Sequence, residues 1–390
     1  MHLLVDCTQI SKKKAGVGVY ALNLVRELAE TYPGLTMSLL VQGDDQDFDI
    51  KRPNVTLIKV PAWLCRKLLF RFVVEQLYIP LLTILRSFDV VHSLHYSFPL
   101  CPLRAKKVVT IHDLTSYTVP EHLLSVKRAY VRFFLKCSRR LADQLIFVSK
   151  STQNDYLQRF SRKLDGCHVV QLGKGPDFRV DLDRELVEQV CAKHTIRKPY
   201  ILSLGMIEPR KNLARLIEAF SIVNASYPGY TLVIAGSKGW MYDGVFEAVH
   251  RHNISDRVIF TGFVQEKDKP FLIRGAQIFA YPSLYEGFGI PVLEAIACGI
   301  PTITSNISSL PEVAGDAALL VDPTSVIDIS NALERLMSDQ ELREELSRKC
   351  VIQAAKFSWK RAASETALVY QQAVVENRFA SSVALRKNLF

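Results

Sequence analysis

The sequence predicts an α/β protein built from two doubly wound domains, each with a parallel β-sheet covered by helices. Short runs rich in Val, Ile and Leu recur along the whole chain, as expected of strands buried on both faces. Amphipathic stretches of helical length separate several of them, for example residues 18–32 and 212–227. This alternation is typical of parallel sheets whose strands are joined by helices.

The predicted strands form two series. In the first half of the chain they cover residues 2–6, 37–43, 54–60, 89–94, 107–113, 144–149 and 168–173. In the second half they cover residues 200–205, 230–236, 257–263, 277–283, 301–305 and 318–323. Each series is long enough for a sheet of its own, so the chain is expected to form two domains.

The expected domain boundaries follow from the gap between the two series. We place the first domain at residues 1–180 and the second at 181–365, with residues 179–196 reading as a connecting helix. A last amphipathic helix, at about residues 366–390, has no strand after it and is expected to pack back on the first domain. Ligands of open parallel sheets bind beyond the carboxyl ends of the strands, so a cleft between two facing domains is the expected site.

Composition narrows the class of protein. With 390 residues, 48% hydrophobic and 23% charged, the chain has the composition of an ordinary globular protein. The eight cysteines are scattered without a Cys-x-x-Cys pair, which fits a reducing compartment. The N-terminus lacks the pattern of a signal peptide. The most apolar segment, residues 68–88, contains Arg71, Glu75 and Pro80, so we expect a cytoplasmic protein without a membrane span.

The positive charge is concentrated in the first domain. Residues 1–180 hold 26 lysines and arginines against 15 acidic residues, whereas the remainder holds 23 against 24. Nucleic acid, an anionic membrane surface or an acidic substrate would each suit such a surface, and so would an ordinary solvated basic face.

The stretch YPSLYEGFGIPVLEAIACG, residues 281–299, carries the strongest site signal. It reads as the end of a strand, a glycine-containing loop and a helix, with Pro291 in the first helical turn and Gly299 just past the end. The helix N-terminus is a natural phosphate site. Glu286 in the loop and Glu294, expected in the first helical turn, would accept hydrogen bonds from sugar hydroxyls on either side. A helix that merely benefits from a favourably placed Glu294 is the alternative.

Three weaker signals follow the ends of other predicted strands. Arg210 and Lys211 enter a helix for which Asn212 is a plausible cap, and two adjacent cations would neutralise a diphosphate. Gly16 and Gly18 lie in a glycine-containing entry to the first helix. His112 ends a strand and is followed by Asp113, a usual place for a site histidine. A solvated basic loop, a plain turn and a packed histidine are the respective structural alternatives.

In this order, the four segments resemble glycosyltransferase family 4, whose members have the two-domain GT-B architecture. The resemblance spans nearly the whole chain and includes VVTIHDLT, LGMIEPRKN, EGFGIPVLEAIACGIPTITS and FSWKRAA. It implies the retaining transfer of a sugar from a nucleotide-diphosphate donor without a bound metal or cofactor. One departure is Met206, where many relatives have arginine, so the diphosphate charge would rest on Arg210 and Lys211.

The resemblance also implies roles for individual residues. Glu294 would bind the ribose, Glu286 the donor sugar, and Arg210 with Lys211 the diphosphate. The loop Gly287, Phe288, Gly289 and Ile290 would hold the sugar or the distal phosphate through backbone N–H groups. Three further contacts complete the expected site: His112 at the donor sugar, Gly16 with Gly18 at the phosphate or acceptor, and Val264 at the base.

Retention is expected through attack on the same face as the departing diphosphate, which would take the acceptor's proton. Glu286 as a covalent nucleophile is the alternative. A retaining hydrolase-like mechanism would then need a second carboxylate about 5 Å away as the acid, and the sequence offers no obvious one.

The expected donor is GDP-mannose, with a UDP- or dTDP-sugar such as glucose, N-acetylglucosamine or rhamnose as the alternative. The expected acceptor is a saccharide or lipid-linked saccharide, because residues 64–77 and 127–141 read as basic amphipathic helices that would sit on the inner face of an anionic membrane. Core-packed helices with solvated basic faces remain the alternative. No nucleic acid is expected as a partner.

Three rival functions remain. A phosphorylase of the same architecture would need a pyridoxal-binding lysine, and no feature marks one. A sugar-nucleotide epimerase would act on the donor alone. A non-catalytic sugar-nucleotide sensor is disfavoured because Glu286, Glu294, Arg210 and Lys211 are all present.

Overall fold

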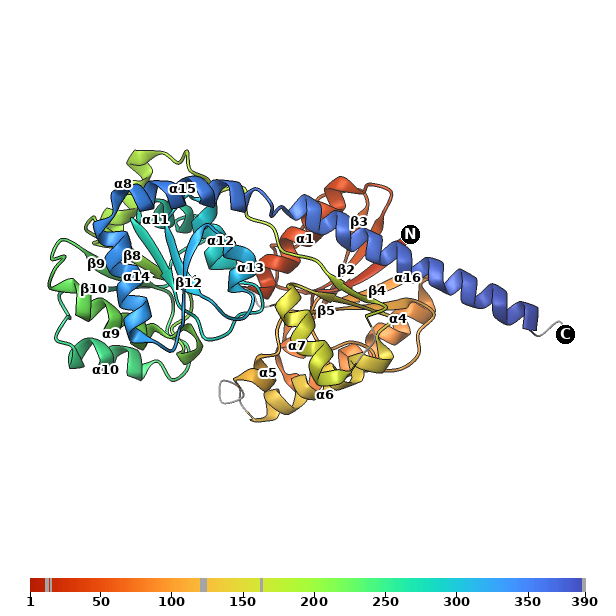
Figure 1. Ribbon diagram of the computed structural model, residues 1–390. Helices are drawn as coiled ribbons and strands as arrows, with labels where there is room; N and C mark the ends of the chain where they lie inside the picture. Colours follow the sequence, from red (N-terminus) through yellow and green to blue (C-terminus); the bar gives the residue numbers. More distant parts are fainter. Residues whose placement is uncertain (11–13, 15, 120–124, 162–163, 388–390) are drawn as a thin grey trace. The chain divides into compact units, whose positions relative to one another are not determined.

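The computed structural model describes the backbone of residues 1–10, 14, 16–119, 125–161 and 164–387, and the side chains as far as Val375. Within it the chain forms two compact units (Figure 1). Unit 1 contains most of the chain up to Gly173 together with the segment from Ser358 onward, and unit 2 contains Lys174–Phe357. Each unit is a parallel sheet with helices on both faces.

The sheet of unit 1 has seven strands in the order β3-β2-β1-β4-β5-β6-β7, all parallel. Its central strands are almost fully buried because helices cover both faces. The bounds are β1 His2–Asp6, β2 Thr36–Gln42, β3 Val55–Val60, β4 Val90–Ser93, β5 Lys106–Ile111, β6 Gln144–Phe147 and β7 Cys167–Val169.

The helices of unit 1 are α1 Val17–Thr31, α2 Ala62–Arg66, α3 Leu68–Val73, α4 Ile79–Leu85, α5 Thr115–Thr118, α6 Ser125–Leu141, α7 Lys150–Phe160 and α16 Trp359–Lys387. A π-helical turn, η1 Val74–Tyr78, joins α3 to α4, so that residues 68–85 are helical throughout. Arg71, Glu75 and Pro80 therefore do not interrupt this segment. Within the described part of the chain, it is the one helical stretch with the length and composition of a membrane span, which is weak evidence by itself.

Unit 2 has a six-stranded parallel sheet in the order β10-β9-β8-β11-β12-β13. Its strands are β8 Tyr200–Leu204, β9 Thr231–Ala235, β10 Val258–Gly262, β11 Ile278–Tyr281, β12 Thr302–Ser305 and β13 Ala318–Val321. Its helices are α8 Arg184–Lys193, α9 Leu213–Asn224, α10 Asp243–Arg251, α11 Lys269–Gly275, α12 Ile290–Ala297, α13 Leu310–Ala314, α14 Val326–Ser338 and α15 Gln340–Ala354, with a 3₁₀ turn, η3, at Pro209–Lys211.

Helix α16 lies against α1 and the middle strands of unit 1. Buried polar contacts fix it there, because the Tyr370 hydroxyl bonds to His92 Nδ1 at 2.7 Å and His92 Nε2 bonds to Thr110 at 2.9 Å. The helix begins at Trp359 instead of about 366, and residues 388–390 of the expected helix lie outside the described residues. Gly173 allows the close passage, since a Cβ there would lie 2.1 Å from the Trp359 nitrogen.

The boundary between the two units lies at slightly different residues from those expected. Residues 174–180 belong with unit 2, not with the first domain. A contact with α11 accounts for this assignment, because the carbonyl of Val180 accepts a hydrogen bond from Arg274 on that helix.

Both sheets have a topological switch point, where the strand order reverses and a crevice opens at the carboxyl ends of the strands. In unit 1 it lies between β1 and β4, and in unit 2 between β8 and β11. The segments that follow these four strands are therefore the first places to look for ligand-binding groups.

Candidate functional site

The loop after β11 and helix α12 have the predicted form. Pro291 is in the first turn of α12, and Gly299, just after its end, has a positive φ of 72°. Gly289 precedes the helix with φ 104°, and a Cβ there would lie 2.7 Å from Leu310 Cδ2. Only glycine fits this turn without strain, and it brings the backbone close to the start of the helix.

Two serines hold the loop by its carbonyl groups. Ser309 Oγ donates to the carbonyls of Glu286 and Phe288, at 2.9 Å each, and Ser308 Oγ accepts from the Glu286 N–H. Among the described residues, the N–H groups of Phe288, Gly289 and Ile290 have no acceptor. Three free donors at a helix N-terminus suit an anion or a polar sugar atom.

Glu286 is the centre of a buried ionic network. Its Oε1 accepts from Lys211 Nζ at 2.7 Å, from Ser283 at 2.7 Å and from the Tyr281 hydroxyl at 2.9 Å. Its Oε2 lies 2.7 Å from Arg210 NH1. The structure therefore joins three predicted residues from two loops that follow β8 and β11, the strands at the switch point.

The charges in this network are strongly coupled. Burial by itself would raise the pKa of Glu286, but Arg210 and Lys211 outweigh it and hold that pKa at about 2. Burial lowers the pKa of Lys211, against the opposing effect of Glu286. For Arg210, Glu286 and Glu208 overcome the effect of burial and raise the pKa. Glu286 is thus ionised at neutral pH, and its carboxylate lies against the guanidinium of Arg210 and the amino group of Lys211.

Arg210 is anchored from several sides. It donates to Glu208 Oε1 at 2.6 Å and to the Tyr285 carbonyl at 2.8 Å. The prediction that the side chain of Asn212 caps α9 is wrong. This side chain donates instead to the carbonyls of Pro282 and Pro323. Asn212 therefore ties the loop after β8 to the loop after β11, which keeps the cations in place.

Glu294 differs from expectation in its position on α12. It lies in the second turn, not the first, since the helix begins at Ile290. Its side chain is only 6% exposed, and no hydrogen bond to its carboxyl group is present among the described residues. Burial raises its pKa to about 7, while Lys269 opposes the shift and Glu266 adds to it. A buried carboxyl group without a partner is a costly feature that a ligand hydroxyl would relieve.

Val264, predicted to contact the base, is buried two residues after the end of β10. Gly262 before it has φ 67°, which turns the chain at the carboxyl edge of the sheet. Among the described residues, no group of three or more His, Cys, Asp or Glu side chains is arranged to hold a metal ion.

The remaining predicted residues belong to unit 1. His112 directly follows β5 and is buried, with Nε2 2.9 Å from the Leu94 carbonyl. Because a carbonyl only accepts, Nε2 carries the proton in the neutral ring and Nδ1 is left as an acceptor. Burial lowers the pKa of His112, although the Leu94 carbonyl and Asp113 oppose the shift, so the ring is neutral at pH 7.

Gly16 stands at the N-terminus of α1 with φ 47°, and nothing lies within 4 Å of a Cβ built on it. Gly18 is more restricted, since a Cβ there would lie 3.1 Å from Lys14 Cδ. Ala15, between Lys14 and Gly16, lies outside the described residues. The assigned roles of these glycines and of His112 remain predictions.

Sequence reasoning missed several partners of the network, among them Tyr281, Ser283, Glu208 and Ser308. Tyr281 and Ser283 were visible as the end of β11, next to Glu286. Glu208 was visible two residues before Arg210, whereas Ser308 gave no signal, because it meets the site only through the fold.

Two family models match the chain: Glycosyltransferase Family 4 over residues 15–178 and Glycosyl transferases group 1 over residues 189–350. A relative, the O-antigen chain mannosyltransferase B of Escherichia coli, is 32% identical over 267 residues, which is 68% of this chain and 70% of the relative.

Solved structures show the same fold. Sucrose-phosphate synthase from Thermosynechococcus elongatus superposes with a TM-score of 0.74 at 20% identity, over 96% of this chain and 99% of that one. Anabaena HepE in complex with UDP-glucose gives 0.72 at 17% identity, over 97% and 100%. With its two parallel α/β sheets and these matches along both halves, the chain belongs to glycosyltransferase family 4, the retaining glycosyltransferases of GT-B fold.

Proposed function

We propose that this glycosyltransferase moves mannose from GDP-mannose to a lipid-linked saccharide in polysaccharide or glycolipid biosynthesis. The observation that carries the reaction type is the buried pairing of Arg210 and Lys211 with Glu286, next to the free N–H groups of Phe288, Gly289 and Ile290. Mannose is favoured by the similarity to a protein named as an O-antigen chain mannosyltransferase.

The network would stabilise the leaving diphosphate. Breaking the bond between sugar and phosphate builds negative charge on the diphosphate, and preorganised cations and N–H groups in a dry site stabilise that charge most effectively. Arg210 and Lys211 supply the cations. Glu286, held by Ser283 and Tyr281, keeps them in position and offers acceptor oxygens to the sugar hydroxyls.

The other contacts to the nucleotide-sugar donor are proposed from the positions of the remaining predicted residues. Glu294 would accept hydrogen bonds from the ribose hydroxyls, which would provide its unpaired carboxyl group with partners. Val264 would lie at the base, and His112 of unit 1 would offer Nδ1 to the donor sugar. No carboxylate then has to act as a nucleophile, and the diphosphate takes the acceptor's proton.

GDP-mannose is expected to stabilise the protein against heat more than other nucleotide sugars. A ligand at a hundredfold excess over its Kd should raise the Tm by about 5–10 °C, given the size of unit 2. The measurement is a thermal-shift screen with GDP-, UDP-, ADP- and dTDP-sugars, followed by release of nucleotide diphosphate in the presence of acceptor. A larger shift with UDP-glucose, the ligand in the HepE structure, would contradict the mannose assignment and leave the reaction class in place.

An exposed apolar surface on unit 1 supports contact with a membrane. It comprises nine side chains of α2, α3, η1 and α4, and Ile84 and Leu77 are 78% and 67% exposed. The remaining members are Trp63, Leu69, Phe70, Phe72, Val73, Leu81 and Leu85. We call this set the α2–α4 face. Glu75, the one acidic residue among residues 62–85, is fully buried, so these helices present no exposed negative charge to an anionic bilayer.

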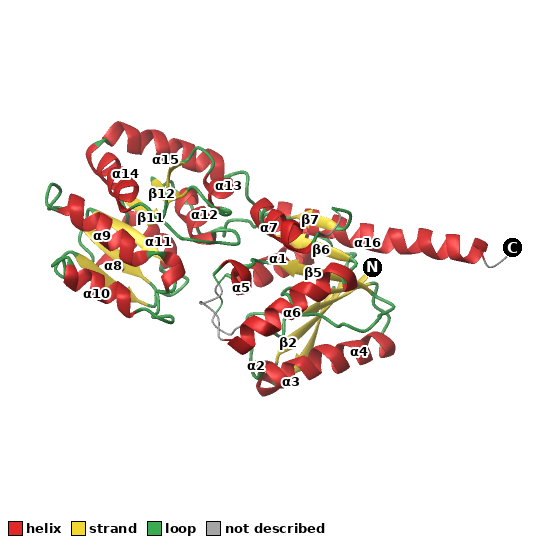
Figure 2. Cartoon of the chain, turned by 60° about the horizontal axis from the view of Figure 1, so that its bottom comes forward, coloured by secondary structure: helices red, strands yellow, loops and turns green. Residues whose placement is uncertain are grey.

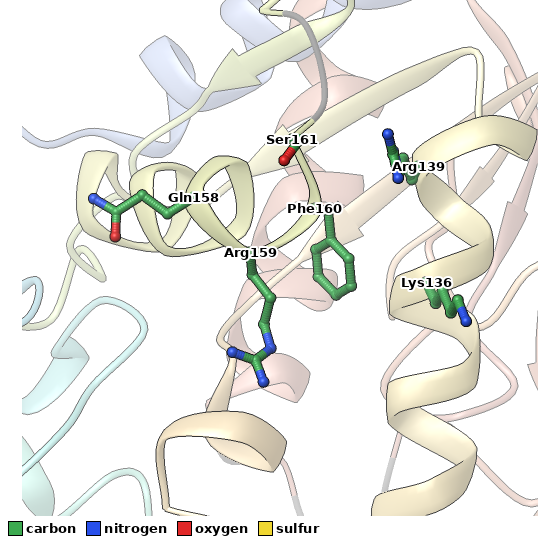
Figure 3. A pocket seen from close by; sticks show the side chains of 6 residues that line it. All are labelled: Lys136, Arg139, Gln158, Arg159, Phe160 and Ser161. Atoms are coloured by element: carbon green, nitrogen blue, oxygen red, sulfur yellow. The ribbon is translucent and has the colours of Figure 1, made fainter.

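Cations lie next to this face. Helix α6 packs against α3, since the rings of Phe72 and Phe134 are 6.4 Å apart, and the two helices are neighbours in Figure 2. Exposed cations on α6 include Lys127, Lys136 and Arg140. A recess of about 550 Å³ at the end of α6 and α7 is lined by Lys136, Arg139, Gln158, Arg159, Phe160 and Ser161 (Figure 3). Apolar side chains on one helix and exposed cations on the helix packed against it suit an anionic lipid surface.

We expect the double variant Leu77→Glu/Ile84→Glu to lose binding to anionic liposomes. Two apolar side chains that enter the interface are worth enough that partitioning should fall by at least about tenfold. Flotation with vesicles containing phosphatidylglycerol, at low and high salt, measures it. The matched control is Leu320→Glu/Ile327→Glu, which changes two exposed apolar residues of unit 2. Equal flotation of both variants, or none by the wild type, would refute the membrane proposal.

A further inference from the structure

A second buried polar cluster lies at the switch point of the unit 1 sheet, and it is made of residues for which the sequence predicts no role in binding. Asp6 is the last residue of β1 and Gln9 follows it, while His95 and Ser97 follow β4. Glu75 reaches these residues from η1. Arg71 of α3 and Tyr130 of α6 complete the set, which we call the Glu75 cluster.

Glu75 is the centre of this cluster and is fully buried. Its Oε1 accepts from Gln9 Nε2 at 2.8 Å and from Ser97 Oγ at 2.9 Å, and its Oε2 accepts from the Tyr130 hydroxyl at 2.7 Å. Arg71 Nε is 3.5 Å from Oε1. These contacts tie β1, β4, η1 and α6 together around one carboxyl group.

The helix that carries Glu75 is irregular at this residue. The π-helical turn Val74–Tyr78 interrupts the α-helical pattern between Arg71 and Ile79. Such turns are rare and occur mostly at functional sites, because they redirect a side chain at a cost in helix regularity. Here the turn directs Glu75 into the protein, while Leu77 is exposed on the α2–α4 face.

Several atoms of the cluster lack a hydrogen-bond partner although they are buried. They are Asp6 Oδ2, Gln9 Oε1, His95 Nδ1 and Arg71 Nε. Asp6 is only 3% exposed, and its other oxygen accepts from the N–H and hydroxyl of Thr8 at 2.9 and 2.7 Å. Unmet polar atoms are costly in a folded protein. Arg71 Nε still has its ion pair with Glu75, so the other three atoms are the ones that call for a ligand.

The cluster has a route to solvent and to the expected reaction centre. Gln9, Arg71, His95 and Tyr130 are each partly exposed and form its rim. The rings of His95 and His112 are 6.3 Å apart. A ligand on this rim would thus lie close to the histidine that is expected to contact the donor sugar.

The unpaired atoms match the hydroxyl groups of a saccharide. A carboxylate oxygen and an amide oxygen accept hydrogen bonds from hydroxyls, while the guanidinium donates to them, and a hydroxyl does both. The cluster also favours a neutral ligand over an anion, because among its described residues two carboxyl groups, Asp6 and Glu75, face one guanidinium group, that of Arg71. Burial foremost, then the charge of Asp6, raises the pKa of Glu75 to about 7, with Arg71 opposing, so at neutral pH this carboxyl group is present in both forms.

We propose that the Glu75 cluster binds the hydroxyl groups of the acceptor saccharide, with Asp6 Oδ2 and Gln9 Oε1 as the accepting atoms and Arg71 as the donor. Glu75 acts through these residues as a positioning residue. The inference rests on the proposed function, because it assigns the acceptor of the same transfer. It also explains why Glu75 of η1 is buried while Leu77 of the same turn lies on the α2–α4 face: a lipid-linked acceptor would place its lipid on that face and its sugar in the cluster.

The test is the variant Asp6→Asn with methyl α-D-mannoside as the acceptor probe. Asparagine keeps Oδ1 for Thr8 and replaces the unpaired oxygen by an NH₂ group. We expect the KM for the probe to rise about 10- to 100-fold, since the accepting oxygen is replaced by a donor and its hydrogen bond is lost. The affinity for GDP-mannose, measured without acceptor, should stay that of the wild type. The matched control is Asp143→Asn, the same change beside β6 at the opposite edge of the sheet.

Saturation-transfer NMR with the same probe separates this inference from the proposed function, because it requires no turnover. If the wild type binds the probe and Asp6→Asn does not, the cluster is an acceptor site, even where no mannose is transferred from GDP-mannose. Equal signals from wild type and variant, or none from the wild type, would overturn the assignment. Gln9→Met, at a partly exposed residue, gives the same comparison if Asp6→Asn fails to fold.

Discussion

Replacing Lys211 by methionine is expected to lower kcat for sugar transfer by about 100- to 1,000-fold, the usual effect of removing one preorganised group that stabilises developing charge. Lys211 Nζ lies 2.7 Å from Glu286 in a site from which most water is excluded. Its charge therefore acts at low dielectric on the departing diphosphate. Methionine keeps the apolar stem, so packing is changed little. Initial rates at saturating donor and acceptor measure the effect.

The same change should also destabilise the protein, and the two effects are separable. Loss of one cation leaves Glu286 with Arg210 as its single charged partner, and a buried carboxylate with incomplete pairing lowers the Tm. Adding Glu286→Gln removes that charge, so the double variant should recover Tm but not kcat. The control is Lys198→Met, which breaks a 2.6 Å ion pair with Glu188 on the surface of the same unit. Recovery of kcat in the double variant would show that Lys211 only supports the structure.

All thirteen predicted strands are present. Each is a local run of β-branched and apolar residues bounded by turns, and such a run is enough to predict a strand that is buried on both faces. The loop and helix around Glu286 were predictable for a related reason. Gly289, Pro291 and Gly299 each occupy a backbone position that few other residues tolerate, so the local sequence specifies the local geometry.

What could not be predicted depends on contacts between distant segments. Asn212 has the composition of a helix cap, but the carbonyls of Pro282 and Pro323 offer its side chain better partners. Directly bonded residues of the Glu75 cluster are up to 88 positions apart, and in the sequence Glu75 reads as a charge within an apolar helix. The order of the strands in the sheet decides which loops meet at a switch point. That order cannot be read from the sequences of the individual strands.

Glu294→Gln is expected to weaken nucleotide binding and to stabilise the folded protein. Glutamine retains one acceptor oxygen but loses the charge, and the hydrogen bonds of a carboxylate to two ribose hydroxyls are about twice as strong as neutral ones. We expect the Kd for GDP to rise about 10- to 100-fold. Titration calorimetry with GDP measures this, and Glu334→Gln, at an exposed carboxylate of α14, is the matched control. Unchanged affinity would remove Glu294 from the ribose site.

The stability effect has a defined dependence on pH. Burial, with Glu266 adding and Lys269 opposing, raises the pKa of Glu294 from 4.5 to about 7 in the folded protein. Between these pH values the folded state binds more protons than the unfolded state, so this carboxyl group lowers stability progressively as pH rises, and fully above pH 7. The variant should therefore be more stable than wild type by up to about 3 kcal/mol at pH 8, and the gain should vanish below pH 4.5. Urea denaturation at several pH values measures the difference.

The opposite signs of the two effects separate a binding role from a structural one. A residue that serves packing loses stability on replacement, whereas a group kept for a ligand is often a burden to the empty protein. Glu294, buried and without a partner, is expected to behave in the second way. GDP should also stabilise the wild type more at pH 8 than at pH 5, because the ionised carboxyl group that it binds is then the form present. A variant that is both less stable and unchanged in GDP affinity would make Glu294 a packing residue and move the ribose site elsewhere along the edge of the sheet.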